Sequence, residues 1–548
     1  MIRRRLNDFL AEERWEFAPH EQPAMPGSPG SPDHPWRRRG AYAGIAVLLG
    51  LTGGLGNALV AANTTTLQGA LGLDPAEIAW LPTVYVMTNV SINLLLIKFR
   101  QQFGLRPFAL IFLGLYALAT FAHLFVRDFS SAIVVCAISG MAGASVSSLC
   151  LYYMMQALPA KWRLKAVVLG IGVPQCATPL ARLFSPDLLA LSQWRTLYLF
   201  ELGLAMLSLA AVAWLRLPPT NRQKAFEPLD FLTFSLFAGS TALFCAVLGL
   251  GRIVWWTNAP WIGWALIAGI PMFAAALIIE HQRVNPLLNT RWLGSADIVR
   301  FTIVTVVARI VLSEQTYAAT GLLTLLGQNN DQLVPFFTIL FLASVAGVVV
   351  SAITLDVERL THPVMLAIAM VAVAAFVDSH STSLTRAPQL YVTQAVIAFS
   401  ATLFLGPSLL FGMTRALQQG SGHIISFIAL FGIINSVGGL AGTALLGSYQ
   451  QVREKANSAA LVQAIDPTDP IVTQRLAAGG AAVGRVVGDP ALRQAEGGAI
   501  LAQTTTREAN VLAFNDVFRL VALVAAATAA YLMFLLGRRH WRARKAVP

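Results

Sequence analysis

Charged residues are scarce in this chain of 548 residues, because Asp, Glu, Lys and Arg together make up only 12% of it. Soluble proteins contain roughly 25%. Hydrophobic residues account for 56% of the sequence, and a soluble protein so apolar would have too little polar surface to cover its core. The composition therefore excludes a soluble protein, a disordered protein and a DNA-binding domain, and it predicts a polytopic membrane protein.

Cysteine is also rare. The four cysteines lie in apolar segments and none belongs to a C-x-x-C pair: Cys136, Cys150, Cys176 and Cys245. We therefore expect small buried side chains rather than disulfides or metal ligands. A Walker motif is absent from the sequence, which excludes ATP as the direct energy source. Because no hydrolase or metalloprotease motif is present either, the sequence predicts neither an enzyme nor a bound cofactor or metal.

Long apolar runs are what the sequence has in abundance. About 20 residues of helix cross the ~30 Å hydrocarbon core of a bilayer. The chain offers fourteen such runs, at about 41–62, 78–98, 105–126, 130–158, 165–184, 194–215, 229–250, 259–280, 298–326, 332–355, 363–378, 389–411, 423–448 and 511–537. Strands of a β-barrel would alternate apolar and polar residues, whereas these runs are continuously apolar. The sequence therefore predicts an all-α membrane protein with about 14 transmembrane helices.

The distribution of positive charge predicts the orientation. Short loops assigned to the inside hold 13 Lys and Arg residues, and those assigned to the outside hold four. Because Lys and Arg stay on the cytoplasmic side, the net charge of +12 indicates topology rather than nucleic-acid binding. We expect both termini in the cytoplasm, with a disordered extension over residues 1–40 and a basic tail over 538–548.

Two connections are longer than the others. Residues 216–228 have the composition of a linker between two halves, and residues 449–508 separate the last two apolar runs. An unstructured loop of this second length is uncommon unless it is functional, and it contains helix-forming stretches at 450–465 and 491–503. We expect the last two transmembrane helices to continue outward as a helical protrusion that docks a partner. A mobile loop that covers the outer mouth is the alternative.

Four short motifs occur in a specific order. Trp194 and Arg195 open the sixth run, Glu280 precedes Pro286 after the eighth, Gly438 and Gly439 lie in the thirteenth, and Asp516 opens the fourteenth. Together they resemble the fourteen-span drug:proton antiporters of the major facilitator superfamily, of the EmrB and QacA type. The resemblance extends from about residue 41 to residue 537.

This resemblance implies a major facilitator fold with two six-helix bundles, 41–217 and 297–537, and a segment 218–296 that carries two inserted helices. It implies alternating access around a midplane cavity and the export of amphipathic or hydrophobic small molecules in exchange for protons. The protein would then lie in a bacterial inner membrane. In Gram-negative relatives the transporter docks a periplasmic membrane-fusion adaptor and an outer-membrane channel.

Several family features are missing, and they keep two alternatives open. The acidic residue of the first span is replaced by Asn63, and the usual span-four arginine motif is replaced by Cys136–Gly140. The span-five motif survives only as Pro174 and Pro179. An uncoupled facilitator that has lost its proton-coupling residues is therefore an alternative. A non-transporting membrane scaffold or sensor is another.

Charged side chains inside a bilayer cost roughly 2.5–3.5 kcal/mol on insertion scales, so each is a functional hypothesis. Four lie deep in the predicted spans and are candidates for proton coupling: Arg182, Glu201, Arg309 and Glu314. Pairing across helices, or snorkelling of Arg182 and Glu201 to the outer interface, is the structural alternative.

Uncharged polar residues recur within the spans and are candidates for lining a substrate cavity. These are Asn63, Thr64, Gln68, Asn89, Asn93, Tyr152, Gln175 and Asn435. Asn89 and Asn93 are four residues apart and so share one helix face. Interhelical hydrogen bonding is the alternative for each of them.

Overall fold

The transmembrane crossings are helices throughout. The computed structural model describes residues 17–18, 21–23, 27–189 and 194–545. Within these residues, 13 helices are long and apolar enough to cross a membrane. A further crossing is made by α13 (Ala296–Leu312), a π-helix over Gln315–Ala319 and α14 (Thr320–Leu325) in succession. The all-α fold class predicted from the sequence is confirmed.

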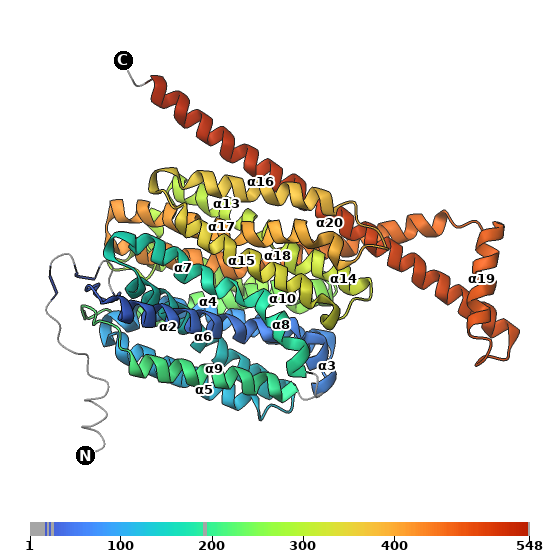
Figure 1. The fold of residues 1–548 in the computed structure, drawn as a ribbon, viewed down its shortest axis with the longest axis horizontal. Helices are drawn as coiled ribbons and strands as arrows, with labels where there is room; N and C mark the ends of the chain where they lie inside the picture. Colours follow the sequence, from blue (N-terminus) through green and yellow to red (C-terminus); the bar gives the residue numbers. More distant parts are fainter. Residues whose placement is uncertain (1–16, 19–20, 24–26, 190–193, 546–548) are drawn as a thin grey trace.

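The N-terminal half contains the helices from α2 to α9. Their bounds are α2 Trp36–Ala62, α3 Thr64–Leu71, α4 Pro75–Phe103, α5 Leu105–His123, α6 Phe129–Ala157, α7 Arg163–Gln175, α8 Ala177–Leu189 and α9 Trp194–Trp214. α6 packs against α2, α4 and α5, and α9 packs against α2 and α5. These contacts form one bundle (Figure 1).

The C-terminal half begins at α13 and is larger. It continues with α15 Val334–Ile353, α16 Thr361–Asp378, α17 Ala387–Gln419, α18 Ser421–Gln463, α19 Pro470–Ala482 and α20 Pro490–Lys545. α17 packs between α15 and α16, and α20 packs on α16 and α18. α2 begins and α20 ends at the same end of the molecule (Figure 1), as an even number of crossings requires.

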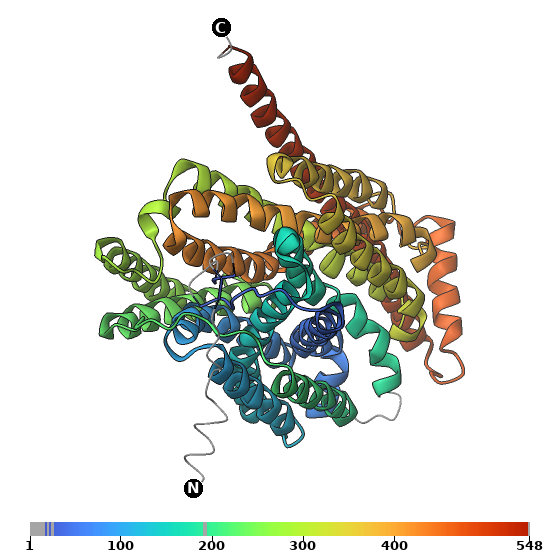
Figure 2. The same ribbon diagram turned by 60° about the vertical axis from the view of Figure 1, so that its left-hand side comes forward.

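Two inserted helices, α10 (Pro228–Val254) and α11 (Pro260–Gln282), lie between the halves in the sequence. α10 contacts α4 of the first half and α18 of the second. A second seam between the halves is made by α7 and α8 against α15, and by α7 against α17 (Figure 2). The halves therefore meet along two seams, and α10 covers one of them.

One helix–helix contact occurs in equivalent form in both halves. A Cβ on Gly140 of α6 would overlap the carbonyl oxygen of Tyr85 and the hydroxyl of Thr88 on α4. A Cβ on Gly347 of α15 would lie 2.5 Å from the carbonyl oxygen of Phe399 on α17 and would also overlap the hydroxyl of Thr402. In each case the threonine lies three residues after the carbonyl and donates to it, at 3.2 Å and 3.1 Å. Glycine is thus required at both contacts because the helix backbones approach closely.

The fifth and ninth crossings are interrupted, although the sequence predicts a continuous helix for each. The fifth divides at Cys176 into α7 and α8. Pro179 has no N–H to donate to the carbonyl of Gln175, so the hydrogen-bond ladder breaks there. In the ninth, the π-helix begins immediately after Glu314. Single π-helical turns inside α-helices are frequent at functional sites.

The expected outward continuation of the last two crossings is present. α18 extends to Gln463, and α20 begins at Pro490, so both helices project beyond the bundle (Figure 1). At the base of the projection, Gln450 donates to Asn510 at 2.7 Å and Arg453 pairs with Asp516 at 2.7 Å. α19 packs on α20 through Gly479 and Gly497. We call residues 456–503 the outer hairpin.

The extension 1–40 is not disordered throughout, contrary to the sequence-based expectation. Residues 27–35 pack against the end of the N-terminal half. Gln156 of α6 donates to the carbonyl of Gly30 at 2.8 Å, and its Oε1 lies 3.1 Å from His34 Nε2. The Pro, Gly and His content suggested disorder, but the Gly30 carbonyl and the His34 ring both hydrogen-bond to one buried glutamine.

Acidification should loosen this segment. Burial lowers the pKa of His34 below its ordinary value of 6.5, and neighbouring Arg38 and Arg39 act in the same direction. The neutral ring is the form that packs, so the segment is most stable above pH 6.5 and loses stability as the pH falls below that value. Hydrogen exchange at residues 28–34 should accelerate between about pH 7.5 and about pH 5.5, after correction for intrinsic exchange. His34→Gln, which cannot become charged, should remove that acceleration, and its persistence would contradict the assignment.

Candidate functional site

Glu314 lies in a buried cluster of acidic and amide side chains. The Gln394 amide nitrogen donates to Glu314 Oε1 at 3.0 Å and to Asp378 Oδ2 at 2.8 Å. The exposed fractions are 0% for Glu314, 2% for Asp378 and 0% for Gln394. Gln315 donates to the carbonyl of Gln394 at 2.9 Å. Two carboxylates from α16 and the α13 junction thus share one donor on α17, and we call Glu314, Asp378 and Gln394 the acid pair site.

No cation compensates the acid pair site among the described residues, because neither acid forms an ion pair there. Glu314 Oε2 is buried without a hydrogen-bond partner within the same residues. Two ionised carboxylates on one amide would repel each other in a site that excludes water. A proton on one of them would remove that repulsion and supply an O–H donor for the vacant lone pairs. The arrangement can therefore bind and release a proton.

Arg309 lies one and a half turns before Glu314 but belongs to a different contact. Its Nη2 donates to the carbonyl of Asn435 on α18 at 3.2 Å, and its Nε is buried without a hydrogen-bond partner among the described residues. Gly438 and Gly439 make room for it, since a Cβ on Gly438 would lie 3.0 Å from Arg309 Cβ. Within the described residues Arg309 forms no ion pair, and its side chain is only half-buried. The structure thus brings three predicted residues, Asn435, Gly438 and Gly439, together against Arg309.

Glu201 lies in the interior of the N-terminal half rather than at the outer interface. Its exposed fraction is 1%, and it accepts a hydrogen bond from Tyr116 at 2.8 Å. Gly56 on α2 allows its approach, because a Cβ there would lie 3.0 Å from Glu201 Oε1. Tyr116 also contacts the carbonyl of Thr52 at 3.1 Å. Glu201 is therefore a second buried acid with a tyrosine partner, and snorkelling does not describe it.

Arg182 connects the two halves at the end opposite the termini. Its Nη1 donates to Asn330 Oδ1 at 3.3 Å, and its guanidinium lies 5.4 Å from the ring centre of Phe337. At the other end of the same seam, Lys165 donates to the carbonyl of Ile353 at 3.2 Å. The four predicted charges therefore occupy four separate places, and none pairs with another.

Asn63 occupies the position where the sequence resemblance led us to expect an acid. It ends α2, and its amide donates to the carbonyl of Leu59 and to Ser185 of α8, both at 2.8 Å. Its Oδ1 is buried without a partner among the described residues. Asn63 thus joins α2 to α8. The neighbouring Thr64 and Gln68 lie on the short helix α3 and are half-buried.

Three of the remaining polar candidates in the N-terminal half, Asn89, Asn93 and Tyr152, make contacts within that half. Asn89 donates to the carbonyl of Gly140 at 3.2 Å, and Asn93 donates to the carbonyl of Asn89 at 2.9 Å. Tyr152 lies beneath the guanidinium of Arg100, 5.1 Å from its ring centre. Gln175 is half-buried at the break between α7 and α8.

The residues of the sequence motifs lie at a helix break, at a helix start and in a turn, where they have structural roles. Pro174 and Pro179 flank the helix break, and the carbonyl of Pro174 lies 2.6 Å from a Cβ placed on Gly54. Trp194 opens α9 with the guanidinium of Arg195 5.5 Å from its ring. Pro286 belongs to a turn in which Glu280 accepts from the backbone of Leu287 and of Leu288.

A charge network that the sequence did not reveal holds the inserted helices in place. Arg283 contacts Glu280 at 2.8 Å, Glu227 at 2.7 Å and Asp230 at 2.7 Å. Asp230 in turn pairs with Lys98 of α4 at 2.6 Å. The hydrogen bond from Arg283 holds the pKa of Glu227 below its usual value. This network joins α4, α10 and α11 at the end where the termini lie.

Sequence reasoning also missed Asp378 and Gln394. Asp378 is the last residue of the eleventh predicted run, so it was indistinguishable from a boundary residue. Gln394 carries no charge and lies near the start of the next run. The signal in the sequence that could have indicated this site is an acid at the end of one predicted helix and an amide near the start of the next. Their contact with Glu314 joins positions 64 and 80 residues apart, which no local pattern encodes.

Two solved structures share this architecture. The human organic anion transporter MFSD10 (TETRAN) is 14% identical with a TM-score of 0.52, over 90% of this chain and 100% of that chain. A bacterial homologue of the human drug peptide transporters PepT1 and PepT2 is 10% identical with a TM-score of 0.54, over 92% of this chain and 99% of that chain. No family model and no curated protein matches the sequence. The chain is a multi-pass membrane protein, and it has the major facilitator fold.

Proposed function

We propose that this protein is a secondary active transporter that exports amphipathic or hydrophobic small molecules across a bacterial inner membrane by alternating access. Protons entering the cell drive the export. The single observation that carries the proposal is the acid pair site, in which two buried carboxylates share the Gln394 amide and no cation of the described residues pairs with either. A membrane protein keeps uncompensated acids inside its bundle at a cost that only a function justifies.

Proton binding at the acid pair site would change how three helices fit together. With one proton bound, a carboxylic acid and a carboxylate can both use the Gln394 amide. Without it, like charges from α16 and the α13 junction oppose each other across α17. The π-helix next to Glu314 is a local change of helical pitch, and it supplies a place where α13 can adjust. Protonation thus favours one packing of the C-terminal half and deprotonation another.

The seams between the halves suit alternating access. Arg182 with Asn330 joins the halves at one end, and Lys165 with Ile353 joins them at the other. Each polar contact includes one hydrogen bond, worth about 1 kcal/mol net, and no ion pair of the described residues lies at either of these two contacts, so no buried charge pair has to break when an end separates. Opening one end while the other stays joined is the rocking motion described for this type of fold.

Arg309 is the group that we propose meets the polar part of a substrate. Its side chain is half-buried, and among the described residues its guanidinium forms no ion pair, donates to the carbonyl of Asn435 and leaves its Nε buried without a hydrogen-bond partner. An anionic or strongly polar substrate group would complete its hydrogen bonding. MFSD10, which shares the fold, is an organic anion transporter, and this likeness supports including amphipathic anions in the substrate class.

Reconstituted vesicles test the proposal directly. The purified protein would be incorporated into liposomes, and uptake of a panel of amphipathic anions, cations and neutral compounds would be measured with and without an imposed proton gradient. Accumulation of at least one compound only with the gradient is expected. Equilibration without accumulation would support the uncoupled facilitator instead, for which the replacement of the span-one acid by Asn63 is the specific observation. Absence of flux for every compound would favour a scaffold or sensor.

The outer hairpin is proposed as the docking element for a periplasmic membrane-fusion adaptor, which continues to an outer-membrane channel. It projects from the bundle on two long helices that are tied at their base by Gln450–Asn510 and Arg453–Asp516. The transport cycle proposed above uses no residue of the hairpin. A projection held at its base by these contacts can present a fixed surface to a partner protein. A mobile loop that only covers the outer opening would not need such contacts.

Replacing residues 456–503 with a short Gly/Ser linker should leave transport across the inner membrane intact but abolish export from the cell. The ties at the base remain, so the variant should still move substrate in isolated inner-membrane vesicles at about the normal rate. Cellular resistance and cross-linking to the adaptor should be lost. A variant that changes only the turn at 483–489 keeps the helices and should behave like the unmodified protein. Retained cross-linking after the replacement would contradict docking.

A further inference from the structure

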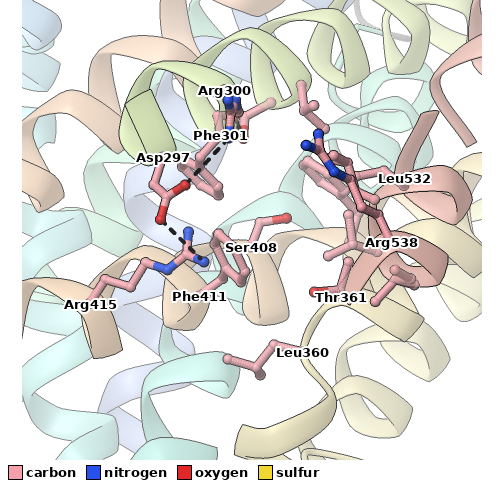
Figure 3. A pocket seen from close by; sticks show the side chains of 16 residues that line it. Asp297, Arg300, Phe301, Leu360, Thr361, Ser408, Phe411, Arg415, Leu532 and Arg538 are labelled. Atoms are coloured by element: carbon pink, nitrogen blue, oxygen red, sulfur yellow. Dashed lines mark hydrogen bonds and ion pairs between the residues drawn. The ribbon is translucent and has the colours of Figure 1, made fainter. Parts of the chain in front are cut away.

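A cavity in the C-terminal half lies away from the acid pair site, at the end of the bundle where the termini lie. Its volume is about 300 Å³, and α13, α17, α20 and the start of α16 enclose it (Figure 3). α20 slants away from the bundle at this end (Figures 1 and 2), so the cavity forms where that helix separates from its neighbours.

The rim of the cavity is positively charged. Arg300, Arg415 and Arg538 line it together with one acid, Asp297. Asp297 lies 3.8 Å from Arg300 and 3.9 Å from Arg415, both longer than the 2.7–2.9 Å of a tight charge-assisted hydrogen bond. Even without Arg415, the guanidinium groups of Arg300 and Arg538 outnumber the one carboxylate among the described rim residues, so the net positive rim attracts a second anion.

The wall of the cavity is apolar. Phe301 of α13 and Phe411 of α17 stack with ring centres 5.6 Å apart, and Leu532 of α20 faces them. The Arg415 guanidinium lies 4.0 Å from the centre of the Phe411 ring, at the boundary between the charged rim and this wall. One molecule that fits both parts must carry an anionic group and an attached hydrocarbon chain.

We propose that the cavity binds an anionic phospholipid, with its phosphate on the arginine rim and the start of one acyl chain against the aromatic wall. Arginine recognises phosphate through paired N–H donors. The orientation inferred from the charge distribution places this end at the cytoplasmic leaflet, which is rich in anionic lipids. The bound lipid would bridge α13 and α20 and fill the space that their divergence leaves.

Lipid binding to the purified full-length protein in detergent tests this assignment, with phosphatidylglycerol as the probe and phosphatidylcholine as the zwitterionic comparison. Native mass spectrometry would give the affinity of each. We expect phosphatidylglycerol to bind at least about tenfold more tightly. Arg300→Gln combined with Arg538→Gln should lower the affinity for phosphatidylglycerol about tenfold, with each arginine contributing roughly a factor of several.

Two further variants keep the test decisive. Arg291→Gln combined with Arg359→Gln removes two exposed arginines from the same end but outside the cavity, and Arg359 lies 3.8 Å from Asp356 just as Arg300 lies 3.8 Å from Asp297. That control should leave the affinity unchanged. Asp297→Asn removes the one acid among the described rim residues and should tighten binding about threefold, a gain that a misfolded protein could not show.

Three results would overturn the proposal. The first is equal loss of affinity in the control and in the rim variant. The second is equal binding of phosphatidylcholine and phosphatidylglycerol. The third is tighter, competing binding of dodecyl phosphate, which would assign the cavity to a soluble amphipathic anion instead of a membrane lipid.

Discussion

Glu314→Gln should abolish gradient-driven accumulation of substrate, from a ratio of about fifty to about one. One proton crossing ~100 mV supplies about 2.3 kcal/mol, and this is the energy that the variant could no longer use. The glutamine side chain can still accept the hydrogen bond from Gln394, so the packing should survive. Exchange of labelled for unlabelled substrate needs no net proton movement and should continue at about the normal rate.

Asp378→Asn should have the same effect, and the double variant should be no worse than either single one, because the two acids act as a unit. Glu201→Gln makes the same chemical change at an equally buried acid in the other half. Since Tyr116 can donate to an amide oxygen as well, we expect a loss of less than about tenfold there. Wild-type accumulation with unchanged pH dependence in Glu314→Gln would refute the assignment. Abolished accumulation in Glu201→Gln alone would place the proton site in the N-terminal half.

Gly347→Leu and Gly140→Leu should each destabilise the protein by about 2–3 kcal/mol or prevent its accumulation in the membrane. In both cases one of the obstructing atoms is a backbone carbonyl oxygen, of Phe399 or of Tyr85, which cannot rotate away as a threonine hydroxyl can. The helices would have to separate, and the two equivalent contacts in the two halves would open. Thermal unfolding followed by size-exclusion chromatography in detergent measures the loss.

The matched control is Gly114→Leu on α5, where a Cβ meets nothing within 4 Å. Leucine favours a helix over glycine by nearly 1 kcal/mol, so this variant should be as stable as the unmodified protein or slightly more stable. Unfolding of Gly347→Leu at the same temperature as the control would show that the close contact is absent.

The transmembrane helices could be predicted from the sequence because the hydrocarbon core of a bilayer permits few backbone conformations. A run of about 20 apolar residues without a polar partner has to become a helix there, and all fourteen predicted runs correspond to helical segments. The interruptions were not readable in the same way. Pro179 marks the break at Cys176 only once the structure is known, and nothing local to Glu314 predicts a π-helix after it.

The candidate site residues could be predicted from the sequence only in part, because single charged residues are visible in it but contacts between helices are not. An ionisable residue inside an apolar run is conspicuous, so Glu201, Arg309 and Glu314 could be selected one at a time. Their partners depend on which helices touch. Glu314 meets Asp378 and Gln394, whereas its near neighbour Arg309 turns to α18. Composition also failed to predict the order of residues 27–35, where the Gly30 carbonyl and the His34 ring both hydrogen-bond to the buried Gln156.

A single helix connects the two faces of the molecule. α20 has 56 residues without interruption, which makes it about 84 Å long at 1.5 Å per residue. One end carries the outer hairpin, and Leu532 and Arg538 near the other end line the lipid cavity. A stiff rod of this length that tilts by about 5° about one end displaces the other end by about 7 Å. Binding of a lipid in the cavity would therefore exert a force on the outer hairpin through α20. By linkage, binding of a partner at the hairpin would change the affinity for the lipid by the same free energy.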